Sequence, residues 1–275
     1  MKNKSFMSCL IVLGILLQAS SSFAAAPSRE TLFNQAWKEA TASTNYSFTC
    51  TITSGVAKAP KTSNLTADQK KAVDITLEAL KRYKNILKGT LSGGDRALTT
   101  SQDKINTLGV LNALGAGQLS LDQAMEAVKT AVSKKAQITL LSNQVYYQGD
   151  AGWKTFLDAD FATHFFQSSI DNPLTSSFSK SSFTYKKEDK YGKEKALVYE
   201  GTMTAASTIS LLVPFVGEEA GKQQPLAPTT LFISGDGHLR KIDVKEKVVV
   251  GGLSFTVSQR CEINFKKQAI KAPVG

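Results

Sequence analysis

The sequence has 275 residues, of which 42% are hydrophobic and 20% charged, so a disordered chain is excluded and a sizeable core is expected. Its formal net charge is +10, but no Lys or Arg run is long enough for a nucleic-acid-binding tail, so nucleic acid is excluded as an expected partner. The positive excess favours anionic partners such as a membrane surface, although a solvated lysine surface explains the same balance without a partner.

The first residues have the pattern of a secretory signal peptide. Lys2 and Lys4 precede an apolar run from Cys9 to Leu17, and small residues provide a cleavage site after Ala24. The apolar run is too short to span a bilayer. We therefore expect residues 1–24 to be removed and the rest of the chain to be exported in soluble form, to a periplasm or to the extracellular space.

An amphipathic helix and a strand are expected next. Apolar residues that include Phe33 and Trp37 recur at helical spacing through residues 29–42. Apolar and polar residues then alternate through residues 46–52, as expected for a half-buried strand. Residues 53–65 are expected to form a loop.

Only two cysteines, Cys50 and Cys261, remain after removal of the signal peptide. An exported protein folds in an oxidising compartment, which favours a disulfide between them. Each cysteine occupies an apolar position of its expected strand. The bridge would join the first strand to the last, and closing so long a loop should stabilise the fold by roughly 4 to 5 kcal/mol. Two buried free thiols are the alternative.

The segment 66–135 is expected to be helical. Thr66 with Gln69 and Ser120 with Gln123 are capping-box patterns, and each precedes apolar residues at helical spacing. The spacing predicts helices from Thr66 to the Gly93-Gly94 break, from 101 to 114 and from 120 to 135. Because almost no strand pattern occurs here, we expect residues 66–135 to be a helical insertion.

From residue 136 onward the sequence predicts strands separated by short polar turns, the pattern of an antiparallel meander. A short helix is expected at 158–170, and residues 205–216 are apolar without a clear assignment. The last two strands are long, which suits a strongly curved sheet. The expected strands are 137–141, 144–148, a pair through Phe183 and Leu197, 231–234, 239–250 and 253–265.

No catalytic or metal-binding motif is found in the sequence. The two histidines have no metal-ligand spacing; His164 is expected to be structural within a helix, and His238 to be exposed in a hairpin turn. No CxxC motif or nucleophile elbow occurs. Two S-x-x-K sequences begin at Ser101 and Ser177, but so short a pattern arises easily by chance. We therefore expect a non-enzymatic protein without a cofactor or metal, and a hydrolase that uses Ser177 is the enzymatic alternative.

Large aromatic side chains recur on strand after strand, interleaved with polar residues. One interpretation is ordinary core packing. The other is a strongly curved antiparallel sheet whose concave face these side chains line, with covering helices that leave a cavity for acyl chains. On the second interpretation the apolar lining consists of Trp37, Phe48, Tyr147, Trp153, Phe183, Tyr185, Tyr199, Phe232 and Phe255.

Three segments together carry a family resemblance. They are the amphipathic helix leading into the first strand, the hairpin Val145-Tyr146-Tyr147-Gln148-Gly149-Asp150-Ala151-Gly152-Trp153, and the stretch from Thr230 to Lys241 followed by Cys261-Glu262-Ile263-Asn264-Phe265. They resemble the LolA-like half-barrel group of periplasmic lipoprotein carriers and related lipid-binding lipoproteins. The resemblance covers residues 29–52 and about 136–266.

The resemblance implies an α+β fold in which a strongly curved antiparallel sheet, a half-barrel, packs on helices. Residues 25–275 would form this single domain, and residues 66–135 its inserted helical block. The resemblance further implies a bacterial cell-envelope protein that binds a lipid or an acylated protein reversibly, gaining about 0.8 kcal/mol per buried methylene. The alternative is an envelope protein-binding or structural module whose cavity is filled and whose helical insertion is the interaction surface.

Overall fold

The structure, a computed structural model, describes residues 26–59, 61–92, 97–141, 144–149, 152–156, 182–204, 226–250, 253–266 and 269–271. The helices of this part are α2 (Arg29–Ala42), α3 (Ala67–Arg82), α4 (Thr107–Gly115) and α5 (Leu121–Thr130). The strands are β1 (Tyr46–Lys58), β2 (Lys84–Ser92), β3 (Ala97–Ile105), β4 (Lys134–Leu141), β5 (Gln144–Gly149), β6 (Gly152–Phe156), β7 (Thr184–Tyr191), β8 (Glu194–Thr204), β9 (Leu226–Ser234), β10 (Leu239–Val250) and β11 (Leu253–Asn264).

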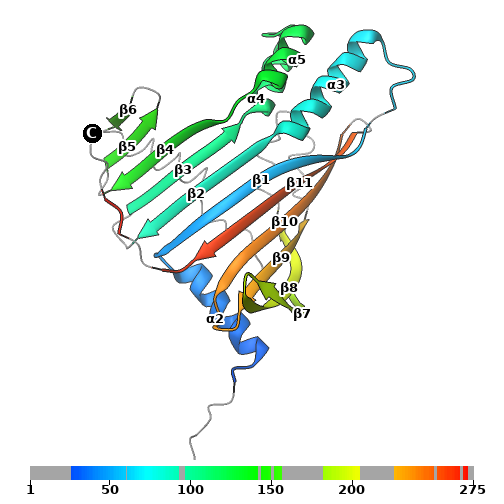
Figure 1. The fold of residues 1–275 in the computed structure, drawn as a ribbon. Coiled ribbons are helices and arrows are strands. Elements are labelled where there is room, and N and C mark those ends of the chain that lie inside the picture. The colour runs from blue at the N-terminus through cyan, green and yellow to red at the C-terminus, as the bar shows by residue number, and fades with distance from the viewer. Residues whose placement is uncertain are drawn as a thin grey trace, which may run out of the picture.

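All strands of the described part belong to one open antiparallel sheet. Their order is β6-β5-β4-β3-β2-β1-β11-β10-β9-β8-β7, so the first and last strands of the chain lie side by side in the middle. Figure 1 shows that β7, β8 and β9 curl away from the plane of the other strands. The expected α+β fold, with a curved antiparallel sheet packed on helices, is confirmed.

The helices gather at two places on the sheet. α2 lies across the ends of β1, β11 and β10, while α3, α4 and α5 lie together at the opposite end of the central strands (Figure 1). α2 begins where predicted, because the Ser28 hydroxyl accepts a hydrogen bond from the Thr31 amide at 3.1 Å and so caps the first turn. The capping boxes at Thr66 and Ser120 are also confirmed, and they begin α3 and α5.

The prediction that the helix from Thr66 continues to Gly93 is wrong. α3 ends at Arg82, and the chain continues directly as β2, which pairs with β1 and β3. Leu80 and Leu87 lie at helical spacing, which suggested a longer helix. Leu87 and Leu91 equally fit the two-residue period of a strand, and pairing on both sides decides between the two patterns.

The predicted helix at 101–114 is wrong in its first part. β3 occupies Ala97–Ile105, and α4 begins at Thr107 after Asn106, whose side chain accepts a hydrogen bond from the Gly109 amide at 3.2 Å. The β-branched Thr99 and Thr100 of this segment favour a strand once β2 and β4 are available for pairing. The segment predicted to be a helical block therefore contributes two strands to the sheet.

Two smaller differences concern element ends. β1 continues to Lys58, into the segment predicted to be a loop, because β11 pairs with it along this length. α5 ends at Thr130, since Ala131 is already extended and β4 begins at Lys134. The predicted strands of the C-terminal half are confirmed as β4, β5 and β7 to β11.

The predicted disulfide between Cys50 and Cys261 is confirmed. The two residues lie directly opposite each other on β1 and β11, and both are buried. The bridge therefore joins the first and last strands in the middle of the sheet, across a sequence separation of 211 residues.

Several predictions fall outside the described residues. They concern the signal peptide at 1–24, the helix at 158–170 with His164, Ser177, and the apolar segment 205–216. Within the part of the chain that is described, none of the helices combines the length and the apolarity needed to cross a membrane.

Candidate functional site

The sheet has an apolar face and a polar face. Phe48 and Cys50 of β1 are buried in the apolar face, whereas Ser47 and Thr49 alternate with them on the other. We call the apolar side, on which the helices pack, the inner face and the opposite side the outer face. Residues directly opposite each other on neighbouring strands share a face, so the strand register assigns the other side chains.

Two buried clusters occupy the inner face. The first, the α2 core, packs α2 against β1 and β8 to β11 and contains Leu32, Phe33, Ala36, Ala40, Tyr46, Phe48, Cys50, Phe183, Leu197, Tyr199, Ala227, Leu231, Ile233, Leu239, Ile242, Val244, Cys261 and Ile263. The second, the α3–α5 core, contains Ile75, Ala79, Leu80, Tyr83, Leu111, Ala124, Val128, Phe255 and Val257. The two cores lie at opposite ends of the same face.

Five of the nine predicted lining residues belong to the α2 core or pack against it: Trp37, Phe48, Phe183, Tyr185 and Tyr199. Their rings contact one another and the helix. The rings of Phe33 and Tyr199 have centroids 4.4 Å apart, and those of Trp37 and Phe183 lie 6.0 Å apart. The structure therefore brings these residues together as packed side chains around α2.

The N-terminal end of α2 is held by β7 and β8. The Arg29 guanidinium lies 4.3 Å above the ring of Tyr185 and forms an ion pair with Glu188 at 3.4 Å. The Tyr199 hydroxyl donates a hydrogen bond to the Arg29 carbonyl oxygen at 2.9 Å. Tyr185 and Tyr199 thus combine apolar packing with contacts that position the first turn of the helix.

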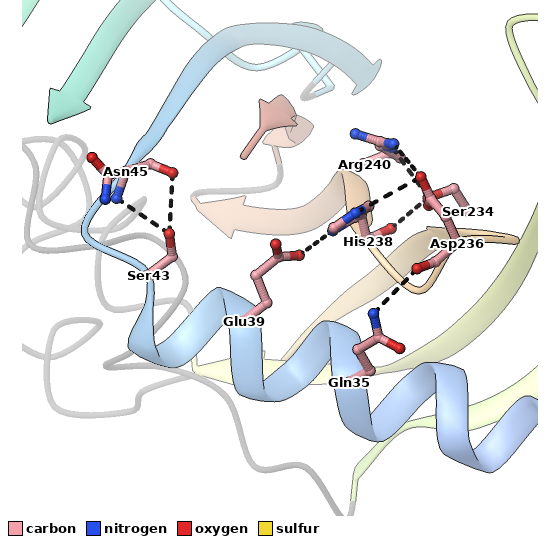
Figure 2. Close-up of polar contacts among 8 residues, drawn as sticks. All are labelled: Gln35, Glu39, Ser43, Asn45, Ser234, Asp236, His238 and Arg240. Atoms are coloured by element: carbon pink, nitrogen blue, oxygen red, sulfur yellow. Dashed lines mark hydrogen bonds and ion pairs between the residues drawn. The ribbon is translucent and has the colours of Figure 1, made fainter. Parts of the chain in front are cut away.

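The C-terminal half of α2 is held by the β9–β10 hairpin (Figure 2). His238 Nδ1 lies 2.5 Å from Glu39 Oε2, and the Gln35 side chain donates a hydrogen bond to the Asp236 carbonyl oxygen at 3.2 Å. The prediction that His238 is exposed is therefore wrong, since only 32% of its side chain is accessible. Gly237 has φ +81°, and Gln35 fills the space that a Cβ atom would need there.

Inside the hairpin, Asp236 is held by two neighbours. It accepts a hydrogen bond from the Ser234 hydroxyl, and its carboxylate pairs with Arg240 at 2.9 Å (Figure 2). Burial works against the charged form of Asp236, but the Ser234 hydroxyl and the Arg240 guanidinium outweigh it and hold the pKa of Asp236 below its usual value. The hairpin is thus a preorganised support for α2, and the helix is a structural part of the fold.

The remaining predicted lining residues are distributed over three places. Phe255 lies in the α3–α5 core. Phe232 lies on the outer face, because its neighbours Leu231 and Ile233 both face the α2 core, and its ring is covered by the Lys241 ammonium at 3.7 Å. Trp153 is also on the outer face, as shown by its register with Gln148 and, through it, Gln137.

The outer face contains a hollow of about 480 Å³. It is lined mainly by polar residues of β1, β2 and β11, with Gln137 of β4 and Tyr191 of β7 at its margins. Thr49 of β1 lies directly opposite Lys88 of β2 on one side and Glu262 of β11 on the other, so the three residues form one cross-strand row. The polar lining offers hydrogen-bonding groups but little apolar surface for an acyl chain.

Tyr147 occupies a different part of the inner face. It lies opposite Ile138, in the row that leads through Gly89 to Phe48. We call this part of the inner face, on β2, β4 and β5, the apolar wing; its residues are Leu91, Ile138, Leu140, Val145 and Tyr147.

The apolar wing is continuous with the α2 core. The Phe48 ring extends over β2, with ring carbons 2.3 Å from the place where a Cβ atom of Gly89 would lie. Leu91 packs against both the α2 core and Val145. In the described residues, the cluster around Val145 consists of strand residues, whereas each of the other two clusters includes helical residues. Among the described elements, the wing is therefore the apolar part of the inner face without a helical cover.

A buried carboxyl group lies between the two cores. Glu246 of β10 is 3% exposed and lies opposite Val257 of the α3–α5 core, two residues after Val244 of the α2 core. Burial raises the pKa of Glu246 to about 7, and its Oε2 atom has no hydrogen-bond partner. Sequence reasoning missed this residue, although the alternation of Ile242, Val244 and Glu246 in β10 places it at an inward position.

No group of three or more His, Cys, Asp or Glu side chains in the described residues could hold a metal ion. The S-x-x-K sequence that begins at Ser101 lies in strand β3. What the described residues do provide is an open, curved antiparallel sheet with packed helices, an adjoining apolar wing and one buried carboxyl group.

No protein-family model matches the sequence, and no curated protein matches it. The chain is similar to the solved structure of LprF from Mycobacterium bovis, with 10% identity, coverage of 90% of this chain and 98% of that one, and a TM-score of 0.43. It is also similar to the Mycobacterium tuberculosis lipoprotein LppX, with 10% identity, coverage of 89% of this chain and 99% of that one, and a TM-score of 0.39. A third similar structure is that of a LolA superfamily protein from Nitrosomonas europaea, with 9% identity, coverage of 89% of this chain and 96% of that one, and a TM-score of 0.22.

With identities of 9 to 10% and TM-scores of 0.43 or less, these likenesses establish neither a family nor a function for this chain. The function is therefore derived from the contacts of this chain.

Proposed function

We propose that the protein is an exported, non-enzymatic binder of a lipid or an acylated protein in the bacterial cell envelope, and that the acyl chain lies on the apolar wing. The N-terminal pattern of Lys2, Lys4 and a short apolar run ending before Ala24 supports export. The absence of a catalytic motif in the sequence supports binding without chemistry.

The apolar wing carries the proposal. Its residues Ile138 and Leu140 are only partly buried, and they adjoin the α2 core through Leu91. An acyl chain placed along this surface would bury further apolar area at about 0.8 kcal/mol per methylene, so even partial enclosure gives useful affinity. The part of the inner face beneath α2 is filled by side chains, which leaves the wing as the better place for a ligand.

Exposed lysines on the outer face support a second partner, an anionic membrane surface. Lys88, Lys135 and Lys245 are exposed there, on three different strands. Together with the net charge, which is +10 for the whole sequence and +8 without Lys2 and Lys4 of the signal peptide, they support an approach of the outer face to an anionic membrane surface. An acyl chain on the inner face and a membrane surface at the outer face would not compete for the same residues.

Native mass spectrometry tests the binding of lipid. The protein should be produced in an exporting bacterial host, purified without detergent and measured before and after organic extraction. We expect an additional mass in the phospholipid or fatty-acid range that extraction removes. A protein that carries no such mass and takes up none from added phospholipid would contradict the proposal and favour a protein-binding or structural module.

A further inference from the structure

Six polar side chains of the hollow on the outer face form a regular grid on β2, β1 and β11. One cross-strand row consists of Lys88, Thr49 and Glu262, and the next row of Thr90, Ser47 and Asn264. Neighbouring strands are about 4.8 Å apart, so about 10 Å separates the Cα atoms of Lys88 and Glu262. The two rows are two residues apart along each strand, which is about 7 Å. A small ligand above the grid can therefore contact several of its side chains at once.

The grid has charges of opposite sign on its two outer strands. Lys88 of β2 and Glu262 of β11 are both exposed, and neither forms an ion pair within the described residues. Lys241 lies opposite Glu262 on β10, but its ammonium pairs with Asp243 at 2.9 Å. Lys88 and Glu262 are therefore available to a ligand, on either side of β1.

Hydrogen-bond acceptors gather on the β11 side of the grid. Asn264 Oδ1 is buried and has no hydrogen-bond partner within the described residues, and the Glu262 carboxylate lies two residues before it on the same face. Tyr191 of β7 lines the same hollow, although β7 is five places from β1 in the strand order. Burial raises the pKa of Tyr191, and the nearby Glu262 carboxylate raises it further. Two acceptors beside an aromatic ring suit a cation that carries N–H donors.

We infer that this hollow binds a small zwitterion, namely a primary ammonium joined by a short chain to a phosphate, as in phosphoethanolamine. Lys88 binds the phosphate, while the ammonium donates hydrogen bonds to the Glu262 carboxylate and to Asn264 Oδ1. A quaternary ammonium has no N–H donor and leaves the Asn264 acceptor unpaired, which costs free energy. The inference goes beyond the proposed function, because it concerns the opposite face of the sheet and requires no acyl chain on the wing.

Nuclear magnetic resonance titration of the full mature chain tests the inference with three soluble probes. Phosphoethanolamine carries both charges and the N–H donors, phosphocholine lacks the donors, and N-acetylphosphoethanolamine lacks the cation. We expect phosphoethanolamine to shift the backbone amide signals of the grid residues. It should bind about fivefold more tightly than either of the other probes, the effect of one hydrogen bond of about 1 kcal/mol.

Four variants separate the roles of the side chains. Lys88→Met and Glu262→Gln each remove one charge at nearly constant size, and each should weaken phosphoethanolamine binding about fivefold. Asn264→Leu removes the unpaired acceptor and should lower the preference over phosphocholine. Lys247→Met is the matched control, because Lys247 is exposed on the outer face of β10, outside the hollow, and its replacement changes the net charge as Lys88→Met does. This control should bind phosphoethanolamine as the wild type does.

Vesicles identify the source of the zwitterion. If phosphatidylethanolamine added to phosphatidylcholine vesicles increases co-sedimentation of the wild type but not of Lys88→Met, the ligand is a lipid headgroup, whereas binding of the soluble probe alone indicates a free ester. No binding, equal affinity for the three probes, or unchanged affinity in Lys88→Met and Glu262→Gln overturns the inference. None of these results depends on lipid retained by the wing, so the proposed function and this inference fail separately.

Discussion

Replacing Cys50 and Cys261 together with alanine is expected to lower the free energy of unfolding by roughly 4 to 5 kcal/mol. The bridge closes a loop with a sequence separation of 211 residues, so its removal greatly increases the freedom of the unfolded chain. It also joins β1 to β11 at the centre of the sheet, where both cysteines are buried. Chemical denaturation of the oxidised wild type and the double variant measures the difference.

Reduced wild-type protein provides the matched control. It keeps both sulfur atoms in the α2 core but lacks the covalent link, so its stability should fall close to that of the double variant. If the double variant lost less than about 1 kcal/mol, the chain-entropy account of the bridge would be contradicted. The stability would then come from the strand pairs alone.

Replacing Phe33 with alanine is expected to lower the free energy of unfolding by about 3 to 5 kcal/mol, the usual cost of removing a buried aromatic side chain. Phe33 is buried, and its ring contacts those of Tyr199 and Trp37. The substitution would therefore leave a cavity between α2 and the sheet. Urea-induced unfolding measures the effect.

Asn34→Ala is the matched control, since Asn34 is the exposed neighbour of Phe33 in the same helix. It should change stability by no more than about 0.5 kcal/mol. A Phe33→Ala variant that is as stable as the wild type would show that α2 covers the sheet loosely, as a removable lid. The account of α2 as a structural helix held by Arg29 and Glu39 would then be wrong.

The features that could be predicted from the sequence are those with strong local patterns. The capping boxes at Thr66 and Ser120 fixed where two helices begin. Strand alternation around Cys50 and Cys261, together with the cysteine count, predicted the disulfide. Each of these predictions depends on residues close together in sequence and on hydrogen bonds or side-chain directions that the local backbone determines.

The segment from Lys84 to Ile105 could not be assigned in the same way. Its leucines fit a helix and a strand equally well, and its strand conformation depends on pairing with β1 and with β4. The predicted lining was also partly wrong, because the sequence does not show which face of the sheet each aromatic residue occupies. Phe232 and Trp153 were grouped with the other aromatic residues by size, whereas strand register places both on the outer face.

The surroundings of two residues of the candidate site, Tyr147 and Glu246, could be recognised only from the tertiary structure. Tyr147 could be selected from the sequence, but its continuity with Phe48 across Gly89 is a consequence of the strand order. Glu246 is charged in the sequence and follows no motif. Only its burial between the two cores shows that its carboxyl group differs from the exposed ones.

The central claim is that an acyl chain binds the apolar wing of the inner face. The most direct test is native mass spectrometry of lipid retained by Tyr147→Glu and Gln148→Glu, two substitutions at neighbouring positions of β5 that face opposite sides of the sheet. A carboxylate at position 147 would have to be desolvated by the chain, so this variant should lose its bound lipid, while the variant at 148 should retain the wild-type amount. Equal retention by the two variants would contradict the claim.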